Sequence, residues 1–429
     1  MQTKRLLLTC SIFVASNLRT CHSFAPIVAN LSHNHFSTET DTDTDTTTAL
    51  TLSSTPIETM SEENEVVVKS ASARIVSYNL LSSHLADPKF HTKCKPEDLS
   101  ASNRLPKILA KLDEEIAICN KSVFCLQEVS HDWATALHVF FAERGYHMIT
   151  GLYGRNFNGY MGIATAFPTE HFKMQKVDLL RLSDKKQDGW PRKPRAPEPS
   201  ALRTYVFNPI YNPMKAAYRY YRPKKRAEDD AWDYSKYRYN QFIGVKLLNR
   251  CLGESASTST STPFWVGNYH MPCAFRTPAV MNIHADLVGS RIQKLAKGEN
   301  GNHDPYVLAG DFNILPESPH YSLLKTGTLD EKDETYPGLK YDAAWKPNFK
   351  GMRSAYFELN GEEPEFTNAS HNGAMNAESF IGTLDYVFMS DEWKVLQVKD
   401  TPKKEKLEGV YPNAEEPSDH VLIAASIEI

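Results

Sequence analysis

The chain has 429 residues, of which 41% are hydrophobic and 23% are charged, and its 48 Lys and Arg residues nearly balance 52 Asp and Glu residues for a net charge of −4. This length supplies enough apolar residues for one large domain or two ordinary domains. The composition excludes a collagen, a coiled coil, a wholly disordered chain and a protein that is basic throughout.

Cysteine usage argues against a disulfide framework and against a structural zinc site. No two of the seven cysteines have the CxxC spacing, and two of them lie in the leader described next. An odd, scattered set of five is typical of reduced, mostly buried thiols. The cysteines are Cys10, Cys21, Cys94, Cys119, Cys125, Cys251 and Cys273.

Residues 1–23 are predicted to be a signal-like leader. Lys4 and Arg5 precede the apolar run Leu6 to Ala15, which has the length of a signal-peptide hydrophobic region. This run is too short to span a bilayer. No later stretch reaches the length of a membrane span, so we expect no stable membrane insertion.

Residues 24–70 are predicted to be a transit-like, disordered linker. The junction Ser23-Phe24-Ala25-Pro26 resembles the one in two-part plastid presequences, and residues 27–57 are rich in Ser and Thr, although three aspartates depart from the acid-poor transit pattern. We therefore expect import into a plastid. The alternatives are secretion, or a cytoplasmic form if translation starts at Met60.

From residue 71 onward, the apolar pattern predicts an α/β domain. Buried strands are expected over 74–80 and 123–127, and helical spacing follows each of them over 105–118 and 133–144. Further strands are expected over 242–248, 264–269, 306–310, 384–389 and 421–427, and a further helix over 278–297. Strands that alternate with helices, with several strands adjacent in sequence, indicate a layered domain with mixed sheets.

Residues 185–238 form a basic and aromatic excursion in this domain. The stretch holds 14 Lys or Arg residues against 6 Asp or Glu residues, and ten aromatic residues. Such a composition can bind phosphates and stack on bases, which makes Arg222, Lys224 and Lys225 candidate substrate-binding residues. The alternative is a surface excursion that its aromatic side chains hold against the core.

In six short segments, an apolar run ends on an acid, an amide or an imidazole. Each has an ordinary structural explanation when considered singly, such as a helix cap or a turn. Their number and order carry the prediction, since carboxylates suit Mg²⁺ or Mn²⁺ and a His–Asp pair supplies an oriented base. The segments are SYNLL at 77–81, LQEV at 126–129, NYH at 268–270, GDFN at 310–313, TLDYVF at 383–388 and PSDH at 417–420.

In this order the six motifs resemble the endonuclease/exonuclease/phosphatase superfamily, whose fold is that of deoxyribonuclease I. The longer segments GDFNILPESPHYSLL, FTNAS and YPNAEEPSDH resemble the deadenylase and nocturnin-like branch most closely. The segment MPCAF after His270 departs from that branch, which tends to carry Trp-Asp-Pro there. The resemblance implies one domain over 71–429 with the fold of a four-layered α-β-β-α sandwich around two packed mixed sheets.

The resemblance also implies a metal site. Glu128 matches the principal Mg²⁺ ligand, Asn79 would help to hold metal and phosphate, and Asp419 resembles a further carboxylate on the metal side. Carboxylate and amide oxygens prefer Mg²⁺ or Mn²⁺ to zinc. The expected cofactor is therefore Mg²⁺, or Mn²⁺ in its place.

Catalytic roles carry over from the family in the same way. Asp311 resembles the carboxylate that positions or deprotonates the attacking water, and Asn313 would bond a non-bridging phosphate oxygen. His420 would contact the scissile phosphate or act as a base, and Asp385 would orient it. His270 would stabilise charge on the phosphate or the leaving group, which is the charge that the reaction builds up.

Two further residues match a family segment beside the nucleotide pocket. They are Phe366, which could stack on a base, and Asn368. Between the two roles, packing in the core is favoured over base stacking for Phe366, because phenylalanine is among the residues most often buried.

The implied activity is metal-dependent hydrolysis of phosphodiesters in RNA or nucleotides, with trimming of single-stranded RNA from its 3′ end as the favoured mode. Other hypotheses stay open. They are a phosphatase that acts on a nucleotide cofactor or a phosphoinositide, a nuclease that acts on DNA, and a non-catalytic protein that binds nucleic acid through residues 185–238. The motifs identify no protein partner.

Overall fold

A computed structural model describes residues 71–195, 213–214, 230–250, 262–298, 303–371, 373 and 378–429, all within one compact unit. The predicted leader and linker lie outside the described residues. Arg222, Lys224 and Lys225 do as well, so the structure says nothing of their proposed part in substrate binding.

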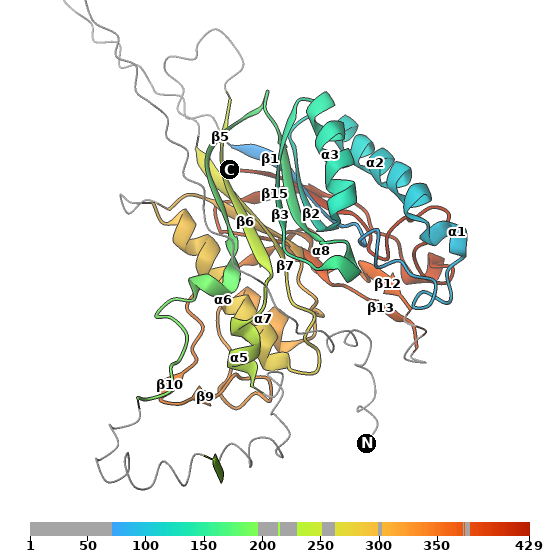
Figure 1. Ribbon diagram of the computed structural model, residues 1–429. Coiled ribbons are helices and arrows are strands. Elements are labelled where there is room, and N and C mark those ends of the chain that lie inside the picture. The colour runs from blue at the N-terminus through green and yellow to red at the C-terminus, as the bar shows by residue number, and fades with distance from the viewer. Residues whose placement is uncertain are drawn as a thin grey trace, which may run out of the picture. The chain divides into compact units, whose positions relative to one another are not determined.

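Two six-stranded mixed sheets form the centre of the fold (Figure 1). The first has the order β15-β16-β1-β2-β4-β3, and the second has the order β11-β14-β8-β7-β6-β5. The first sheet consists of β1 (Ser72–Asn79), β2 (Ser122–Val129), β3 (Tyr146–Leu152), β4 (Gly162–Pro168), β15 (Lys394–Val398) and β16 (Ile423–Glu428). The second consists of β5 (Phe172–Arg181), β6 (Gln241–Asn249), β7 (Pro263–His270), β8 (Tyr306–Asp311), β11 (Arg353–Ser354) and β14 (Asp385–Met389).

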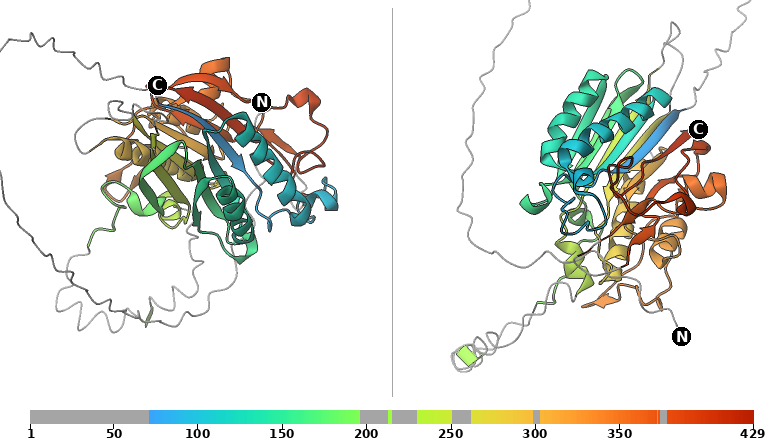
Figure 2. Two further views of the ribbon diagram at one scale, coloured as in Figure 1. Left: turned by 90° about the horizontal axis from the view of Figure 1, so that it is seen from above. Right: turned by 90° about the vertical axis from the view of Figure 1, so that its right-hand side faces the viewer.

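Helices cover the outer face of each sheet. Figures 1 and 2 show α2 and α3 side by side against the first sheet and α6 against the second. The helices are α1 (Pro96–Leu99), α2 (Ala101–Ile118), α3 (His131–Glu143), α5 (Ala231–Lys236), α6 (Pro278–Ala296), α7 (Pro319–Thr326) and α8 (Ala355–Asn360). Short 3₁₀ turns are η1 (Asn156–Asn158), η2 (Leu182–Lys185) and η6 (Lys404–Lys406), and two small sheets pair β9 (Leu339–Lys340) with β10 (Ala343–Ala344) and β12 (Asn368–Ser370) with β13 (Phe380–Gly382).

Alternating strand residues divide the core into three apolar layers. In β1, Ile75 packs between the two sheets, whereas the next residue, Val76, packs under α2 and α3. In β8, Val307 faces the space between the sheets, and Leu308 faces α6. Successive strand residues point to opposite faces, so a strand with both kinds of neighbour is covered on both faces. This arrangement confirms the four-layered sandwich.

The helix α3 illustrates how sequence sets these elements. The side chain of Ser130 accepts a hydrogen bond from the backbone N–H of Trp133 and caps the helix, and Gly145 follows its end with a φ of 72°. Leu137 and Phe141 are fully buried, as the periodicity predicts. Burial of such a side chain stabilises the fold by about 1.5–3 kcal/mol.

The predicted strands and helices are all present, with ends that differ by a few residues. The sequence pattern did not reveal β3, β4, β5, β15, α7 or α8. The edge strand β5 shows why, because most of its residues are exposed and it lacks an apolar alternation. The thiols of Cys94, Cys119 and Cys125 are free, as predicted. Among the described residues, no helix is long and apolar enough to cross a membrane.

Strand register brings polar residues together at one edge of the second sheet. Parallel pairing of β7 and β8 sets His270 opposite Asp311, and antiparallel pairing of β14 with β8 sets Asp385 opposite the same Asp311. Gly310 has a φ of 150°, and a Cβ there would lie 1.9 Å from the carbonyl oxygen of Tyr269. Only glycine therefore allows β8 to approach β7 this closely just before Asp311.

Candidate active site

The carboxylate of Asp311 links the two sheets. Its Oδ2 accepts a hydrogen bond of 3.0 Å from Nδ2 of Asn79, the last residue of β1 in the first sheet. The Oδ1 of Asn79 in turn accepts from the backbone N–H of Leu81, which fixes the orientation of the amide. Both side chains are buried, so this contact holds the ends of β1 and β8 together.

His420 and Asp385 form a buried pair beside this carboxylate. The distance from Nδ1 of His420 to Oδ2 of Asp385 is 2.8 Å, and Oγ1 of Thr367 donates to the same oxygen at 2.6 Å. An ionised carboxylate only accepts hydrogen bonds, so Nδ1 of His420 carries the proton. Nε2 then faces Oδ2 of Asp311 at 3.7 Å.

The surrounding charges set the ionisation of this pair. Burial lowers the pKa of His420, but the carboxylates of Asp385 and Asp311 outweigh it and raise the pKa well above its usual range. Burial also raises the pKa of Asp311, against the opposing effect of His420 and of the hydrogen bonds from Asn313 and Asn79. The imidazole is therefore cationic at neutral pH, next to a carboxylate that accepts a proton more readily than an exposed one.

A second imidazole, that of His270, approaches the same oxygen of Asp311. Its Nε2 is 3.5 Å from Oδ2 of Asp311, and its Nδ1 is 3.4 Å from the hydroxyl of Tyr153. Asn240 donates to the backbone carbonyl of His270 at 2.8 Å. Burial lowers the pKa of His270, so this ring is neutral where that of His420 is charged.

Asn313 follows Asp311 in a left-handed conformation with a φ of 52°. Its backbone N–H donates to Oδ1 of Asp311 at 2.9 Å, and its Nδ2 donates to the carbonyl of Met271 at 3.0 Å. An amide nitrogen carries two N–H donors, so the second stays available to a phosphate oxygen. The strained backbone of a non-glycine residue is typical of functional sites.

Glu128 comes from the first sheet, near the end of β2, also with a positive φ of 55°. Its Oε2 accepts from the backbone N–H of Ser82 at 3.1 Å. Burial raises the pKa of Glu128, and the carboxylate of Asp419 raises it further, while His270 lowers it. Two carboxylates that disfavour each other's charge favour a cation between them.

Unpaired oxygens fit a hard metal ion at this site. Within the described part of the chain, Oδ1 of Asp385 and Oδ1 of Asp419 are buried without a hydrogen-bond partner. Mg²⁺ and Mn²⁺ take such oxygens as ligands. The ligand atoms of Asp311, Asp385 and His420 lie within 4.8 Å of one another. Because Nδ1 of His420 already binds Asp385, carboxylate oxygens are better metal ligands here than this imidazole.

Arg104 of α2 holds the two segments of chain beside Asn79 and Asp419 in place. The sequence did not predict this role. Arg104 is 1% exposed and donates to the backbone carbonyls of Leu80, Leu81 and Pro417, and its guanidinium lies 4.9 Å from the ring centroid of Trp133. Leu80 follows Asn79, and Pro417 comes two residues before Asp419. One buried cation thus fixes two loops that carry predicted metal-side residues.

The structure corrects the assignment of Phe366. Its side chain is fully buried in a cluster with Ala369, Tyr411 and Val421, so the ring has no face for a base. Core packing, the favoured role, explains this residue. Asn368 does lie at the site, because its backbone pairs with that of His420, and Ser370 donates to its Oδ1.

Other residues at the site were missed for physical reasons. Thr367 adjoins the predicted Asn368, and its place in a motif was a usable signal. Tyr153 and Asn240 gave none, because each meets His270 only in the folded protein, Tyr153 from just after β3 of the first sheet and Asn240 from the segment before β6, which pairs with β7. Of the predicted residues that are described, every one but Phe366 lies in or beside the cluster around Asp311.

Comparison with known families agrees with this geometry. The model of the Endonuclease/Exonuclease/phosphatase family matches residues 76–420, which is most of the chain. The chain belongs to this family. The strand-end carboxylates, amides and imidazoles described above all fall inside the matched residues.

Relatives agree with the branch that the motifs indicate. Carbon catabolite repressor protein 4 homolog 4 from Arabidopsis thaliana is 27% identical over 205 residues, which are 43% of this chain and 43% of that protein. The CCR4-Not complex 3′-5′-exoribonuclease subunit Ccr4 of Neurospora crassa is 30% identical over 133 residues, 29% of this chain and 16% of that protein. The chain thus spans less than half the length of these two relatives.

A solved structure shares the fold. The crystal structure of ANGEL2, described as a 2′,3′-cyclic phosphatase and bound to adenosine-2′,3′-vanadate, has a TM-score of 0.58 and is 20% identical. The match covers 84% of this chain and 96% of that one. It supports the two-sheet sandwich.

Proposed function

We propose that this protein is a divalent-metal-dependent hydrolase of phosphodiester bonds that shortens single-stranded RNA from its 3′ end. The observation that carries the proposal is the position of Asp311, which lies within 4 Å of the imidazoles of both His270 and His420 where the two sheets meet. A buried carboxylate beside two imidazoles is suited to activate water for attack on phosphorus.

Each residue has a part in this reaction. Asp311 orients the attacking water and accepts its proton, which its raised pKa favours. The cationic His420, held by Asp385, and the free N–H of Asn313 donate to the phosphoryl oxygens as negative charge grows there. The neutral His270 is placed to donate to a phosphate or leaving-group oxygen.

The family's divalent metal would be held by Glu128 and Asp419, with Asn79 nearby. Bound there, Mg²⁺ or Mn²⁺ would neutralise charge on the phosphoryl oxygens. The unpaired Oδ1 of Asp419 and the raised pKa of Glu128 support this placement. The assignment to Mg²⁺ depends on the oxygen ligands alone.

RNA is the favoured substrate because the relatives include a protein named as a 3′-5′-exoribonuclease. A phosphatase is the main alternative, since ANGEL2 is described as a 2′,3′-cyclic phosphatase and shares the fold. A purely binding protein would need none of the buried ionisable groups around Asp311, which weighs against that alternative.

A substrate panel with product analysis tests the proposal. The panel contains end-labelled single-stranded RNA, RNA that ends in a 2′,3′-cyclic phosphate, single-stranded DNA, a nucleotide cofactor and a phosphoinositide, each with Mg²⁺, Mn²⁺ or EDTA. We expect a ladder of 3′-shortened RNA with metal and none with EDTA. Consumption of the small molecules alone would favour the phosphatase, and no consumption at all would favour a binding protein.

We also propose that the leader directs the protein to a plastid. Support comes from the Ser23-Phe24-Ala25-Pro26 junction and from the Ser and Thr content of the residues that follow. A fluorescent fusion of residues 1–60 should enter the plastid, and the same fusion with Phe24→Ala should not. Export of both fusions from the cell would support secretion instead.

A further inference from the structure

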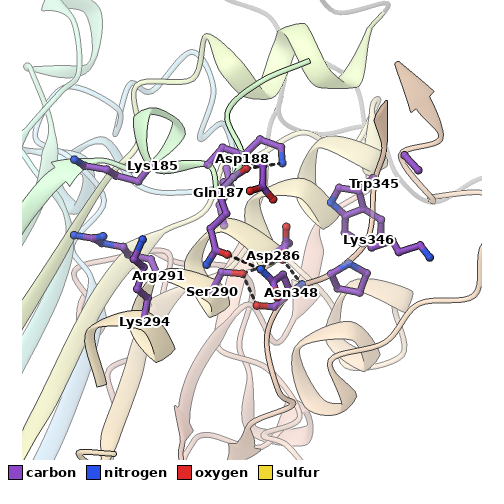
Figure 3. Close-up of a pocket in the computed structure, with 14 residues that line it drawn as sticks. Lys185, Gln187, Asp188, Asp286, Ser290, Arg291, Lys294, Trp345, Lys346 and Asn348 are labelled. Atoms are coloured by element: carbon purple, nitrogen blue, oxygen red, sulfur yellow. Dashed lines mark hydrogen bonds between the residues drawn. The ribbon is translucent and has the colours of Figure 1, made fainter. Parts of the chain in front are cut away.

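A basic cleft of about 310 Å³ lies beside α6, and none of the residues that line it belongs to the cluster around Asp311 (Figure 3). One wall is formed by η2 and the residues after it, the second by α6, and the third by the loop after β10. In Figure 3, Trp345 lies across the cleft from Lys185 and Arg291. The cleft is lined by five cationic residues, Lys185, Lys186, Arg291, Lys294 and Lys346, and by two acidic residues, Asp188 and Asp286.

Three of these cations are unpaired. Within the part of the chain that the structure describes, no ion pair or hydrogen bond engages the ammonium groups of Lys185, Lys294 and Lys346. They stand on three separate walls, so they surround the cleft. Like charges gathered around a concave surface attract an anion, and their mutual repulsion falls when it binds.

The buried carboxyl group in the cleft, that of Asp286, takes part in hydrogen bonds within the protein. Oδ1 of Asp286 accepts from the backbone N–H of Asn348 at 2.7 Å and from Oγ of Ser290 at 3.1 Å. Burial raises the pKa of Asp286. This carboxyl group therefore organises the wall after β10, and it offsets the surrounding positive charge less than a free carboxylate would.

A buried donor in the cleft also lacks a partner. Trp345 lines the cleft and is 1% exposed, and its Nε1 is buried without a hydrogen-bond partner among the described residues. A buried N–H without an acceptor costs about 1–3 kcal/mol, which a ligand oxygen can recover. The site thus offers a neutral donor in addition to charge.

Hydrogen bonds link η2, which forms one wall of the cleft, to the catalytic edge. Leu182, the first residue of η2, donates through its backbone N–H to the carbonyl of Asn240, whose side chain donates to the carbonyl of His270. Three further exposed cations, Arg192, Lys193 and Arg195, follow η2 in the chain. Several cations spread over three walls and the segment after η2 fit a polymer of phosphates better than a single phosphate group.

We infer that this cleft binds the phosphate backbone of single-stranded RNA upstream of the 3′ end that the active site hydrolyses. The inference rests on the proposed function for the identity of the polymer. It makes the enzyme's affinity, but not its chemistry, depend on substrate length. It also gives a role to the described part of the basic excursion.

Binding is measured in EDTA so that the test does not depend on cleavage. The variant Lys185→Gln/Lys294→Gln/Lys346→Gln is compared with Lys121→Gln/Lys173→Gln/Lys394→Gln, which removes the same charge at the sheet ends opposite the active site. Fluorescence anisotropy with labelled RNA of about 20 nucleotides is recorded over a series of salt concentrations. Each phosphate contact contributes about −0.7 to the slope of log K against log salt for a single strand.

We expect the cleft variant to bind RNA at least about tenfold more weakly at low salt and to lose about two from the magnitude of the slope. The control variant should stay within about twofold of wild type, and kcat on a dinucleotide should not change in either. Equal affinity and slope in the two variants would overturn the inference. A folded protein that binds RNA through the cleft but cleaves none would overturn the proposed function and leave this inference standing.

Discussion

At the scale of single residues, the two imidazoles at the site differ in charge because their neighbours differ. His420 faces two carboxylates and is held cationic. For His270, which contacts Asp311 and the hydroxyl of Tyr153, burial and the nearby charge of His420 lower the pKa, so this ring is neutral. In the proposed reaction, the charged imidazole would stabilise phosphoryl charge and the neutral one would donate to the leaving group.

Asp385→Asn tests how His420 is held. The amide cannot hold Nδ1–H with a full negative charge, so His420 loses both its orientation and its raised pKa. We expect kcat for RNA cleavage to fall by about 10²- to 10⁴-fold, the range of a positioned acid–base group. Asp400→Asn, at an exposed position, serves as the control. A variant with more than half the wild-type rate would contradict the role of the pair.

His284 predicts a pH effect on stability. It is fully buried, accepts or donates at 2.7 Å with the hydroxyl of Tyr269, and burial lowers its pKa to about 3. The unfolded value is about 6.5, so below that pH the unfolded chain binds the proton and stability falls. From pH 7 to pH 5, wild type should lose about 2 kcal/mol more of its free energy of unfolding than His284→Phe, measured by urea denaturation.

An exposed histidine gives the matched control for this measurement. His131 has a side chain that is 68% exposed, so His131→Asn should show the wild-type pH dependence. Parallel curves for wild type and His284→Phe would mean that His284 is protonated in the folded protein.

At the scale of elements, strand ends carry the site, and helix α2 fixes the loop after β1 and the segment before β16. Arg104 satisfies three carbonyl oxygens at once. Arg104→Met leaves these oxygens buried without partners, at about 1–3 kcal/mol each. We expect a loss of at least about 3 kcal/mol in the free energy of unfolding, measured by urea denaturation.

The same helix supplies the control. Lys107 forms a partly exposed ion pair of 3.8 Å with Asp98, so Lys107→Met should change stability by less than about 1 kcal/mol. Equal losses in the free energy of unfolding for the two substitutions would show that Arg104 contributes no more to stability than an exposed cation does.

Elements with a strong apolar pattern were predictable, and elements without one were not. The buried strands β1, β7 and β8 read directly as apolar runs, and each ends on a predicted site residue. The exposed edge strand β5 and the six-residue helix α8 have too little pattern to stand out. Their formation depends on tertiary packing.

At the scale of the whole molecule, motif order predicted which residues meet, because each motif lies at a strand end. Tyr153 and Arg104 could not be found in this way, because they lie outside the motifs and reach the site only through contacts made in the folded protein. Phe366 failed for the opposite reason, since a motif position says nothing of whether a ring points to the core or to a ligand. The cleft beside α6 likewise depends on three segments that only the fold brings together.

The most direct test of the central claim is the metal dependence of RNA cleavage by Glu128→Gln. The substitution keeps the shape of the side chain but removes the charge that would hold the metal, while Glu143→Gln does the same at an exposed position of α3. Cleavage rates are measured over a Mg²⁺ titration. The account predicts that Glu128→Gln needs far more Mg²⁺ and cleaves at least about 10²-fold more slowly, with Glu143→Gln unchanged. Wild-type rates and Mg²⁺ dependence in Glu128→Gln would contradict it.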